Sequence, residues 1–332
     1  MLWLVWSPLL ANLVLGLLGP WVARTLPPGA TVRLLPSAMV IVALGTGTVL
    51  TTLGFLSFAQ IPQVALLGSW SAGRLGHEQP WPVEAEAVAG ICAASLLAAG
   101  VITTVCTVRD LVRAARVSRR LTPGPDGVVV VADTVPEAYT LPALPKIPAR
   151  VVMTTALLRA LDDDERRVVF AHEAAHVSGR HHVHIQLAQL ACAANPLLRP
   201  TAHAVRFAVE RAADEAAARQ VGSRHLVARA LARAALSKAA ALRAAGDATD
   251  PGLGSTGRSP VSLSAADGQV AQRATALLTP APRPRRAVAA GLLLLTIVTL
   301  VGASEAVDQL DDRLDQAAMP SACPVAKLAR GC

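Results

Sequence analysis

Charged side chains are scarce in this sequence. Only 16% of its 332 residues are charged and 53% are hydrophobic, whereas soluble domains usually carry about 25% charged residues. A chain with so little charge is poorly suited to a large water-exposed surface, so we expect much of it to lie in a membrane. Aromatic residues are also few, at 3%, and the apolar residues are chiefly Ala, Leu and Val, which favour helices over a β-barrel. The composition predicts a mainly α-helical membrane protein.

Cysteine is scarce as well, and its spacing excludes a zinc ribbon. The five cysteines include no Cys-x-x-Cys pair. Cys92, Cys106 and Cys192 lie in apolar surroundings, and we expect them to be small buried side chains. Cys323 and Cys332 lie in the C-terminal tail and can form a disulfide if the tail faces an oxidising compartment.

The net charge of +8 is unevenly distributed, because the arginines cluster beside apolar runs. This arrangement is typical of membrane topology signals rather than of a nucleic-acid-binding surface, so no nucleic-acid partner is expected. Crossing a bilayer takes about 20 residues, and a shorter run can be completed by arginines that snorkel at its end. The predicted spans are residues 2–23, 36–58, 87–108 and 287–304.

Basic residues follow the first and third predicted spans and precede the second and fourth. The positive-inside rule therefore predicts a multi-pass protein of the cell membrane, with the N-terminus and the C-terminal tail outside. The sequence divides into a membrane domain (residues 1–120), a cytoplasmic domain (121–280), and a last part (281–332) with the fourth span and a short extracytoplasmic tail.

The cytoplasmic domain is expected to combine strands and helices. Runs rich in β-branched residues predict strands at 128–131 and 150–155, whereas the proline-rich segment between them does not suit a central strand. Asp162 and Glu165 have the spacing of a capping box, which predicts the start of a long helix.

Prolines and glycines predict where the helices after this one begin and end. Asn195-Pro196 and Arg199-Pro200 are expected to interrupt the helical run. Two more helices are predicted at 201–222 and 224–245, followed by a mobile loop at 246–268 that is rich in Gly, Ser, Asp and Pro.

The most informative stretch is residues 168–177, Val-Val-Phe-Ala-His-Glu-Ala-Ala-His-Val. On a helix, His172 and His176 lie one turn apart on the same face, where both imidazoles can bind one Zn²⁺. Glu173 lies beside the first histidine and can act as a general base toward water at the metal. An incidental histidine pair on a surface helix is disfavoured, since this helix is largely apolar and buried imidazoles need partners. The pattern predicts a zinc hydrolase with one Zn²⁺ per chain.

A catalytic zinc usually has three protein ligands and an open fourth position. The best candidate for the third ligand is Glu210, in the sequence Glu210-Arg-Ala-Ala-Asp214 on the next long predicted helix. Glu210 and Asp214 are again one helical turn apart. Asp214 is expected to accept a hydrogen bond from a ligating histidine and so to hold that ring in place.

Together, His172-Glu-Ala-Ala-His176 and Glu210-Arg-Ala-Ala-Asp214 resemble the motifs of membrane zinc metallopeptidases of the gluzincin type. The sequence is similar to two families, the BlaR1/MecR1-like peptidases of family M56 and the HtpX/Ste24-like peptidases of family M48. The resemblance spans about residues 128–278. It implies an α+β metalloprotease domain with three zinc ligands, Glu173 as the catalytic acid and base, and Asp214 as the partner of a ligand.

The resemblance implies an integral membrane zinc endopeptidase that hydrolyses a protein or peptide at the cytoplasmic face. The predicted topology favours family M56, whose signalling role makes a cytoplasmic repressor a candidate substrate; β-lactam sensing is not expected, because the predicted tail is short. The first alternative is an HtpX/Ste24-like protease for quality control or processing. The second is a non-catalytic membrane receptor or scaffold with structural zinc, which the complete ligand set and Glu173 disfavour.

Several other histidines accompany the motif. His181, His182 and His184 are expected at a solvated or membrane-proximal helix end, with a contact to substrate or to an oxyanion as the alternative. His203 is expected to be structural. His225 is likewise expected to be structural; because it follows the acidic motif, a contact to an oxyanion or substrate is the alternative.

Overall fold

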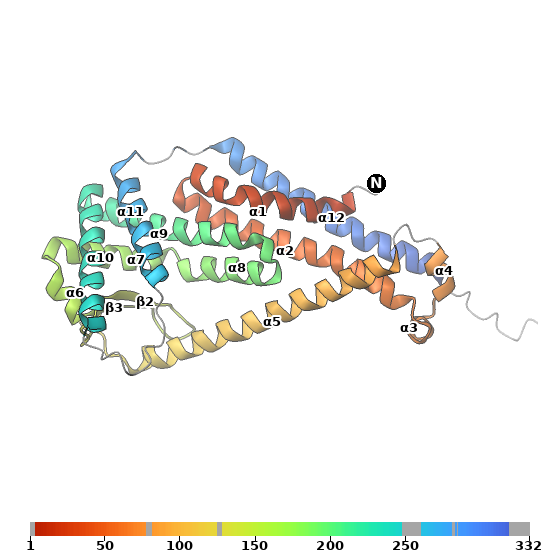
Figure 1. The fold of residues 1–332 in the computed structure, drawn as a ribbon, viewed down its shortest axis with the longest axis horizontal. Coiled ribbons are helices and arrows are strands. Elements are labelled where there is room, and N and C mark those ends of the chain that lie inside the picture. The colour runs from red at the N-terminus through yellow and green to blue at the C-terminus, as the bar shows by residue number, and fades with distance from the viewer. Residues whose placement is uncertain are drawn as a thin grey trace, which may run out of the picture.

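The computed structural model describes residues 4–77, 82–124, 128–247, 260–280, 283 and 285–318. These residues form an elongated, mostly helical molecule with one small sheet near one end (Figure 1). The predicted Cys323–Cys332 disulfide lies outside the described residues.

Long apolar helices make up most of the length of the molecule. Four of them are long and apolar enough to cross a membrane, judged by length and composition. They are α1 (Ser7–Thr25, preceded by the 3-10 turn η1, Leu4–Trp6), α2 (Pro28–Ala59), α5 (Val83–Arg120) and α12 (Arg286–Ala317). Two short helices, α3 (Pro62–Gly68) and α4 (Ala72–His77), lie between α2 and α5 along the chain. The described residues of the predicted spans fall in these four helices and in η1, while the crossing itself stays a prediction.

Helix α5 diverges from the other long helices along its length (Figure 1). It is held close to α2 near its start, where a Cβ added to Gly54 would lie 2.3 Å from the Cα of Gly90. None of the residues in its most apolar stretch is buried, and Cys92 and Cys106 are exposed there. The prediction that these two cysteines are buried was therefore wrong, because α5 turns its apolar surface outward. Such a surface suits lipid rather than water.

The sheet has three strands among the described residues: β1 (Val128–Val131), β2 (Ala138–Leu141) and β3 (Arg150–Thr154). Strand β3 is central, parallel to β1 and antiparallel to β2. The two predicted strands are thus confirmed. The proline-rich segment contributes β2, which is an edge strand, the position where nearby prolines cost the fewest ladder hydrogen bonds.

The sheet leads into α6 (Thr155–Ala160) and then into α7 (Asp163–Ser178), the helix of the histidine pair. The predicted capping box is present, since the Glu165 amide donates to Asp162 Oδ1 at 2.8 Å and the Asp162 amide to Glu165 Oε2 at 3.1 Å. The helix is shorter than expected, because Gly179 and Arg180 separate it from α8 (His181–Ala194). Arg180 has a left-handed backbone, with φ of 48°, which interrupts the helix.

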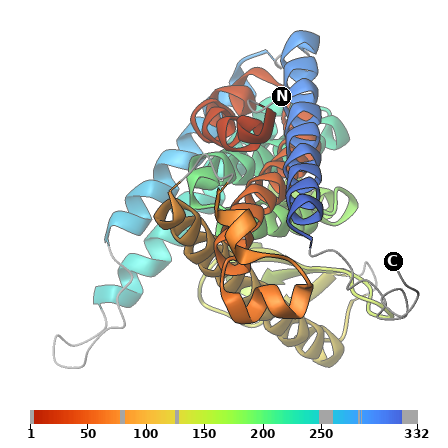
Figure 2. The same cartoon turned by 90° about the vertical axis from the view of Figure 1, so that its right-hand side faces the viewer.

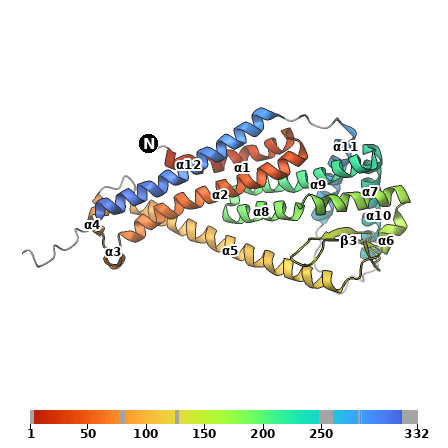
Figure 3. The same cartoon turned by 180° about the vertical axis from the view of Figure 1, so that it is seen from behind.

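Helix α8 and the next long helix form a hairpin that lies alongside α2 (Figure 3). Its turn is η2 (Pro196–Leu198), and its second arm is α9 (Arg199–Val221). Arg199-Pro200 does not interrupt the chain as predicted. Pro200 lies in the first turn of α9, where the amide hydrogen that proline lacks has no helical partner anyway.

The hairpin packs in the same hydrophobic core as the long helices. Glycines on α1 allow the close approach, because a Cβ at Gly19 would overlap the side chain of Thr201 on α9. The Thr201 hydroxyl in turn donates to the carbonyl oxygen of Leu15 at 2.8 Å. The buried residues that α9 contributes to this core are Ala202, Val205, Ala208 and Val209. The helix that carries Glu210 is therefore fixed to the apolar bundle immediately before its acidic motif.

Two further helices, α10 (Arg224–Asp247) and α11 (Pro260–Leu278), lie side by side and project from the bundle (Figure 2). Residues 260–268 were predicted as part of a mobile loop, and this was wrong, since they belong to α11. Proline is favoured in the first turn of a helix, so Pro260 starts α11 rather than preventing it. Leu277 of α11 is buried against Val227 and Ala230 of α10. Of the rest of the predicted loop, residues 246–247 belong to α10, and residues 248–259 lie outside the described residues.

Candidate metal centre

Helices α7 and α9 pack against each other and bring the three predicted ligands together. The candidate ligand atoms of His172, His176 and Glu210 all lie within 4.8 Å of one another. The two Nε2 atoms are 3.1 Å apart. The carboxylate oxygens of Glu210 lie 3.6 Å from His172 Nε2 and 3.7 Å from His176 Nε2. These distances can close around a single ion.

The outer nitrogen of each imidazole also has a partner. His172 Nδ1 lies 3.0 Å from Asp214 Oδ1, and Asp214 is buried, with 3% of its side chain exposed. His176 Nδ1 lies 3.1 Å from His181 Nδ1. Because both Nδ1 atoms are engaged, both Nε2 atoms point to the centre. Two imidazoles, each with a partner at its outer nitrogen, and one carboxylate form a donor set that fits zinc.

The electrostatics of the cluster also favour a cation. Burial lowers the pKa of His172, but hydrogen bonds to Asp214 and Glu210 outweigh it and raise this pKa to about 9. Burial lowers the pKa of His176 to about 4. Burial raises the pKa of Glu210, yet His172, Arg273 and His176 together lower it to about 2. Glu210 and Asp214 therefore favour a positive charge at this site, which a bound divalent cation would supply.

Arg273 on α11 supports both acidic residues. Its Nε and Nη2 donate to the two oxygens of Asp214 at 2.8 and 2.7 Å. Its Nη1 lies 3.0 Å from Glu210 Oε2. The segment around residue 273 was part of the resemblance, but no role was predicted for this arginine. A buried carboxylate such as Asp214 needs a counter-charge, which is a general signal but does not identify which arginine supplies it.

Glu173 points into a cavity of about 840 Å³ beside the cluster. Burial raises its pKa, and a hydrogen bond from the Thr140 hydroxyl to Oε2, at 2.7 Å, opposes that rise. The cavity is bounded by β2 and the residues after it, by α7, and by the start of α8. Thr140 had no predicted role, because no sequence pattern indicated that β2 would lie beside α7.

The remaining histidines divide into near and distant groups. His181 is 6% exposed, so the expectation of a solvated position was wrong for this residue, whose ring packs between Gly179 and His176. His182 lines the cavity. His203 and His225 are exposed, and the structure brings neither into the metal cluster or the cavity lining among the described residues.

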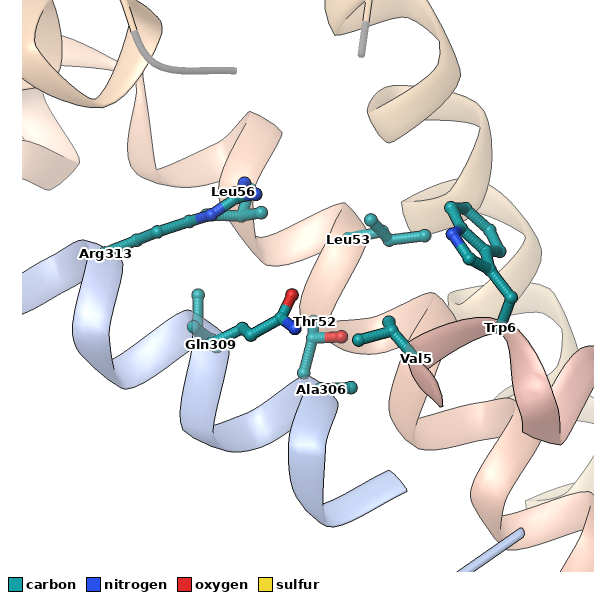
Figure 4. A pocket seen from close by; sticks show the side chains of 9 residues that line it. Val5, Trp6, Thr52, Leu53, Leu56, Ala306, Gln309 and Arg313 are labelled. Carbon is teal, nitrogen blue, oxygen red and sulfur yellow. The ribbon is translucent and has the colours of Figure 1, made fainter. Parts of the chain in front are cut away.

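A second pocket lies far from this site, between η1, α2 and α12 (Figure 4). Its volume is about 40 Å³, and Arg313 and Gln309 lie at its wall among apolar side chains. This is room for a few water molecules but not for a peptide. The cavity beside His172 and His176 is therefore the candidate substrate site.

Residues 105–287, more than half of the chain, match the model of Peptidase family M48. No curated protein and no solved structure matches the chain. Of the two families that the motifs resemble, the match is thus to M48, whose peptidases are generally zinc-dependent and often membrane-bound. With its metal-capable cluster and its long apolar helices, the chain belongs to peptidase family M48.

Proposed function

We propose that this protein is an integral membrane zinc endopeptidase that hydrolyses peptide bonds of a protein substrate. The observation that carries the proposal is the convergence of His172, His176 and Glu210 in the lining of a cavity that Glu173 also lines. In this proposal the first three residues hold the zinc, and Asp214 orients His172.

The reaction is assigned from what each side chain can do. Zinc held by His172, His176 and Glu210 would supply Lewis-acid activation of water and of the scissile carbonyl. Glu173 accepts the proton of the attacking water and returns it to the leaving amine. A raised pKa, caused by burial, suits a carboxylate that must both take up and release a proton.

A polypeptide substrate is supported by the walls of the cavity. Strand β2 forms one wall, and in the described part of the chain its outer edge pairs with no other strand. An extended peptide can add to such an edge through backbone hydrogen bonds, which recognise any sequence. A cavity of about 840 Å³ accommodates several side chains of a peptide held in this way.

The M48 match favours a role in membrane-protein quality control or processing over M56-type signalling, and a repressor substrate has no support from it. A non-catalytic receptor or scaffold with structural zinc is the weaker proposal. A structural site needs no general base, yet Glu173 stands in the cavity beside the cluster.

Zinc content and its removal test the proposal directly. The purified full-length protein in detergent is expected to contain one zinc per chain and to cleave fluorescein-labelled casein. 1,10-Phenanthroline should abolish the cleavage, and added Zn²⁺ should restore it, because the open site exchanges its ion. His176→Ala should lose zinc and activity together, whereas His203→Ala, an exposed position on α9, should keep both. Cleavage by metal-free protein would refute a zinc peptidase.

We further propose that the peptidase domain lies on the cytoplasmic side of the cell membrane. The basic residues at the end of α5 and at the start of α12 support this orientation by the positive-inside rule. In a cysteine-free background, Gln63→Cys on α3 should react with an impermeant thiol reagent in intact cells. Arg243→Cys on α10 should react only after permeabilisation, because both positions are exposed but lie on opposite sides. The reverse labelling pattern would contradict the orientation.

A further inference from the structure

The two histidines of the cluster are supported in different ways. His172 is backed by the carboxylate of Asp214, whereas His176 is backed by the imidazole of His181. The Nδ1 atoms of His176 and His181 are 3.1 Å apart, and the two rings meet edge to face at an interplanar angle of 90°. His181 is 6% exposed, so water has little access to this contact.

The backbone between the helices places the His181 ring there. Gly179 ends α7, and a Cβ at that position would lie 2.5 Å from His181 Nε2. Arg180 has a left-handed conformation, with φ of 48°, and α8 begins directly after it. The absent side chain leaves the space that the ring fills. The reversal at Arg180 turns His181 back toward the helix that carries His176.

Hydrogen-bonding chemistry fixes the direction of the contact. A neutral histidine that binds a metal through Nε2 carries its proton on Nδ1. His176 Nδ1 must therefore donate, and His181 Nδ1 must accept. We propose that His181 is a positioning residue, whose Nδ1 accepts the hydrogen bond that holds His176 with Nε2 toward the metal. This inference rests on the proposed zinc site, and it assigns His181 no contact with zinc or substrate.

Two substitutions of His181 by residues of nearly equal size distinguish the effect of this hydrogen bond from the effect of side-chain packing. Asn carries an oxygen on Cγ, close to where His carries Nδ1, while Leu has as many non-hydrogen side-chain atoms as Asn and no acceptor. Removing the partner of a metal-binding histidine typically weakens metal affinity by about 10–100-fold. We expect His181→Leu to raise the zinc dissociation constant by about 10–100-fold, and His181→Asn to restore most of that loss. The constant is measured in the full-length protein by competition with a fluorescent chelator, without reference to activity.

The role of Gly179 provides a coupled measurement. Gly179→Ala should displace the His181 ring and weaken zinc binding in the wild-type background, because the new Cβ would take the space of the ring. In the His181→Leu background, the same change should have a much smaller effect, since the hydrogen bond is already absent. His184→Asn, an imidazole on the same helix with no described contact to His176, is the matched control and should leave affinity unchanged.

Three outcomes overturn the inference. Unchanged zinc affinity in a folded His181→Leu variant would do so, as would an equal loss in the Asn and Leu variants. Additive effects of Gly179→Ala and His181→Leu would also contradict it. If His176→Ala binds zinc as well as wild type, the proposed zinc site itself fails; if only His176→Ala loses zinc, the site stands and the role of His181 fails.

Discussion

Replacing Glu173 by Gln is expected to reduce cleavage of labelled casein by about 10²–10⁴-fold, the usual contribution of a general base. The substitution keeps the shape of the side chain but removes its ability to accept a proton. Zinc content should not change, because Glu173 is not one of the three side chains whose ligand atoms converge. Initial cleavage rates and metal content measured on the same preparation check both parts.

The control for Glu173→Gln lies on the same helix. Asp163→Asn also removes one carboxylate from α7, but that side chain is 91% exposed and far along the helix from the cluster. It should cleave casein at the wild-type rate. Full activity in Glu173→Gln would show that Glu173 is not the general base. Loss of zinc together with activity would mean that Glu173 supports the metal instead.

The same inactive variant can identify substrates. A protein that the enzyme cleaves should appear as fragments in the membrane proteome of wild-type cells and remain whole in cells that carry only Glu173→Gln. Misfolded or damaged membrane proteins among such substrates would support the quality-control role. Cleavage restricted to one soluble regulator would instead support signalling.

Replacing Arg273 by Met is expected to produce the second large effect. Arg273 is 11% exposed and makes two hydrogen bonds to Asp214, whose side chain is 3% exposed, as well as an ion pair with Glu210. Met retains much of the apolar stem but leaves both carboxylates without their arginine. Breaking a buried ion pair in this way typically costs about 3–5 kcal/mol, so the thermal midpoint should fall by several degrees.

Zinc affinity should fall in the same variant, because Asp214 and Glu210 then lose the group that fixes their orientation. Arg273→Lys should recover little, since a single ammonium group cannot reproduce the two-point contact with Asp214. Arg224→Met is the matched control. Arg224 likewise joins α9 to α11, through Glu215 and the carbonyl oxygen of Ala276, but it contacts none of the cluster residues. Arg224→Met should lower stability and leave zinc affinity unchanged. Equal zinc affinity in the Arg224→Met and Arg273→Met variants would contradict a role for Arg273 at the site.

The sequence-based predictions that the structure supports were based on local residue spacing. The Asp162–Glu165 capping box and the helical registers of His172 with His176 and of Glu210 with Asp214 each depend on residues within one turn. Such pairs are determined by helix geometry, so their relative positions follow from spacing alone. The strands at β1 and β3 were predicted for a similar reason, from short runs of β-branched residues.

Predictions failed where distant segments or backbone conformation decide the outcome. The end of α7 depends on the left-handed Arg180, which no spacing rule indicated. Residues 260–268 form part of α11, which packs on α10, although their composition resembled a loop. The outward position of Cys92 and Cys106 depends on which face α5 turns toward α2, which hydropathy cannot predict.

The sequence by itself determined the type of chemistry: two imidazoles and an adjacent carboxylate on one helix, an acidic pair on another, and apolar runs long enough for a membrane. Tertiary structure alone decided which residues surround that chemistry. Arg273 is 59 positions from Asp214 along the chain, and Thr140 is 33 positions from Glu173. Contacts at such separations depend on how helices and strands pack rather than on their periodicity. The arginine that contacts the carboxylates and the threonine beside the base are therefore evident only in the folded molecule. The histidine that contacts His176 is only five positions away, but its place depends on the left-handed backbone of Arg180.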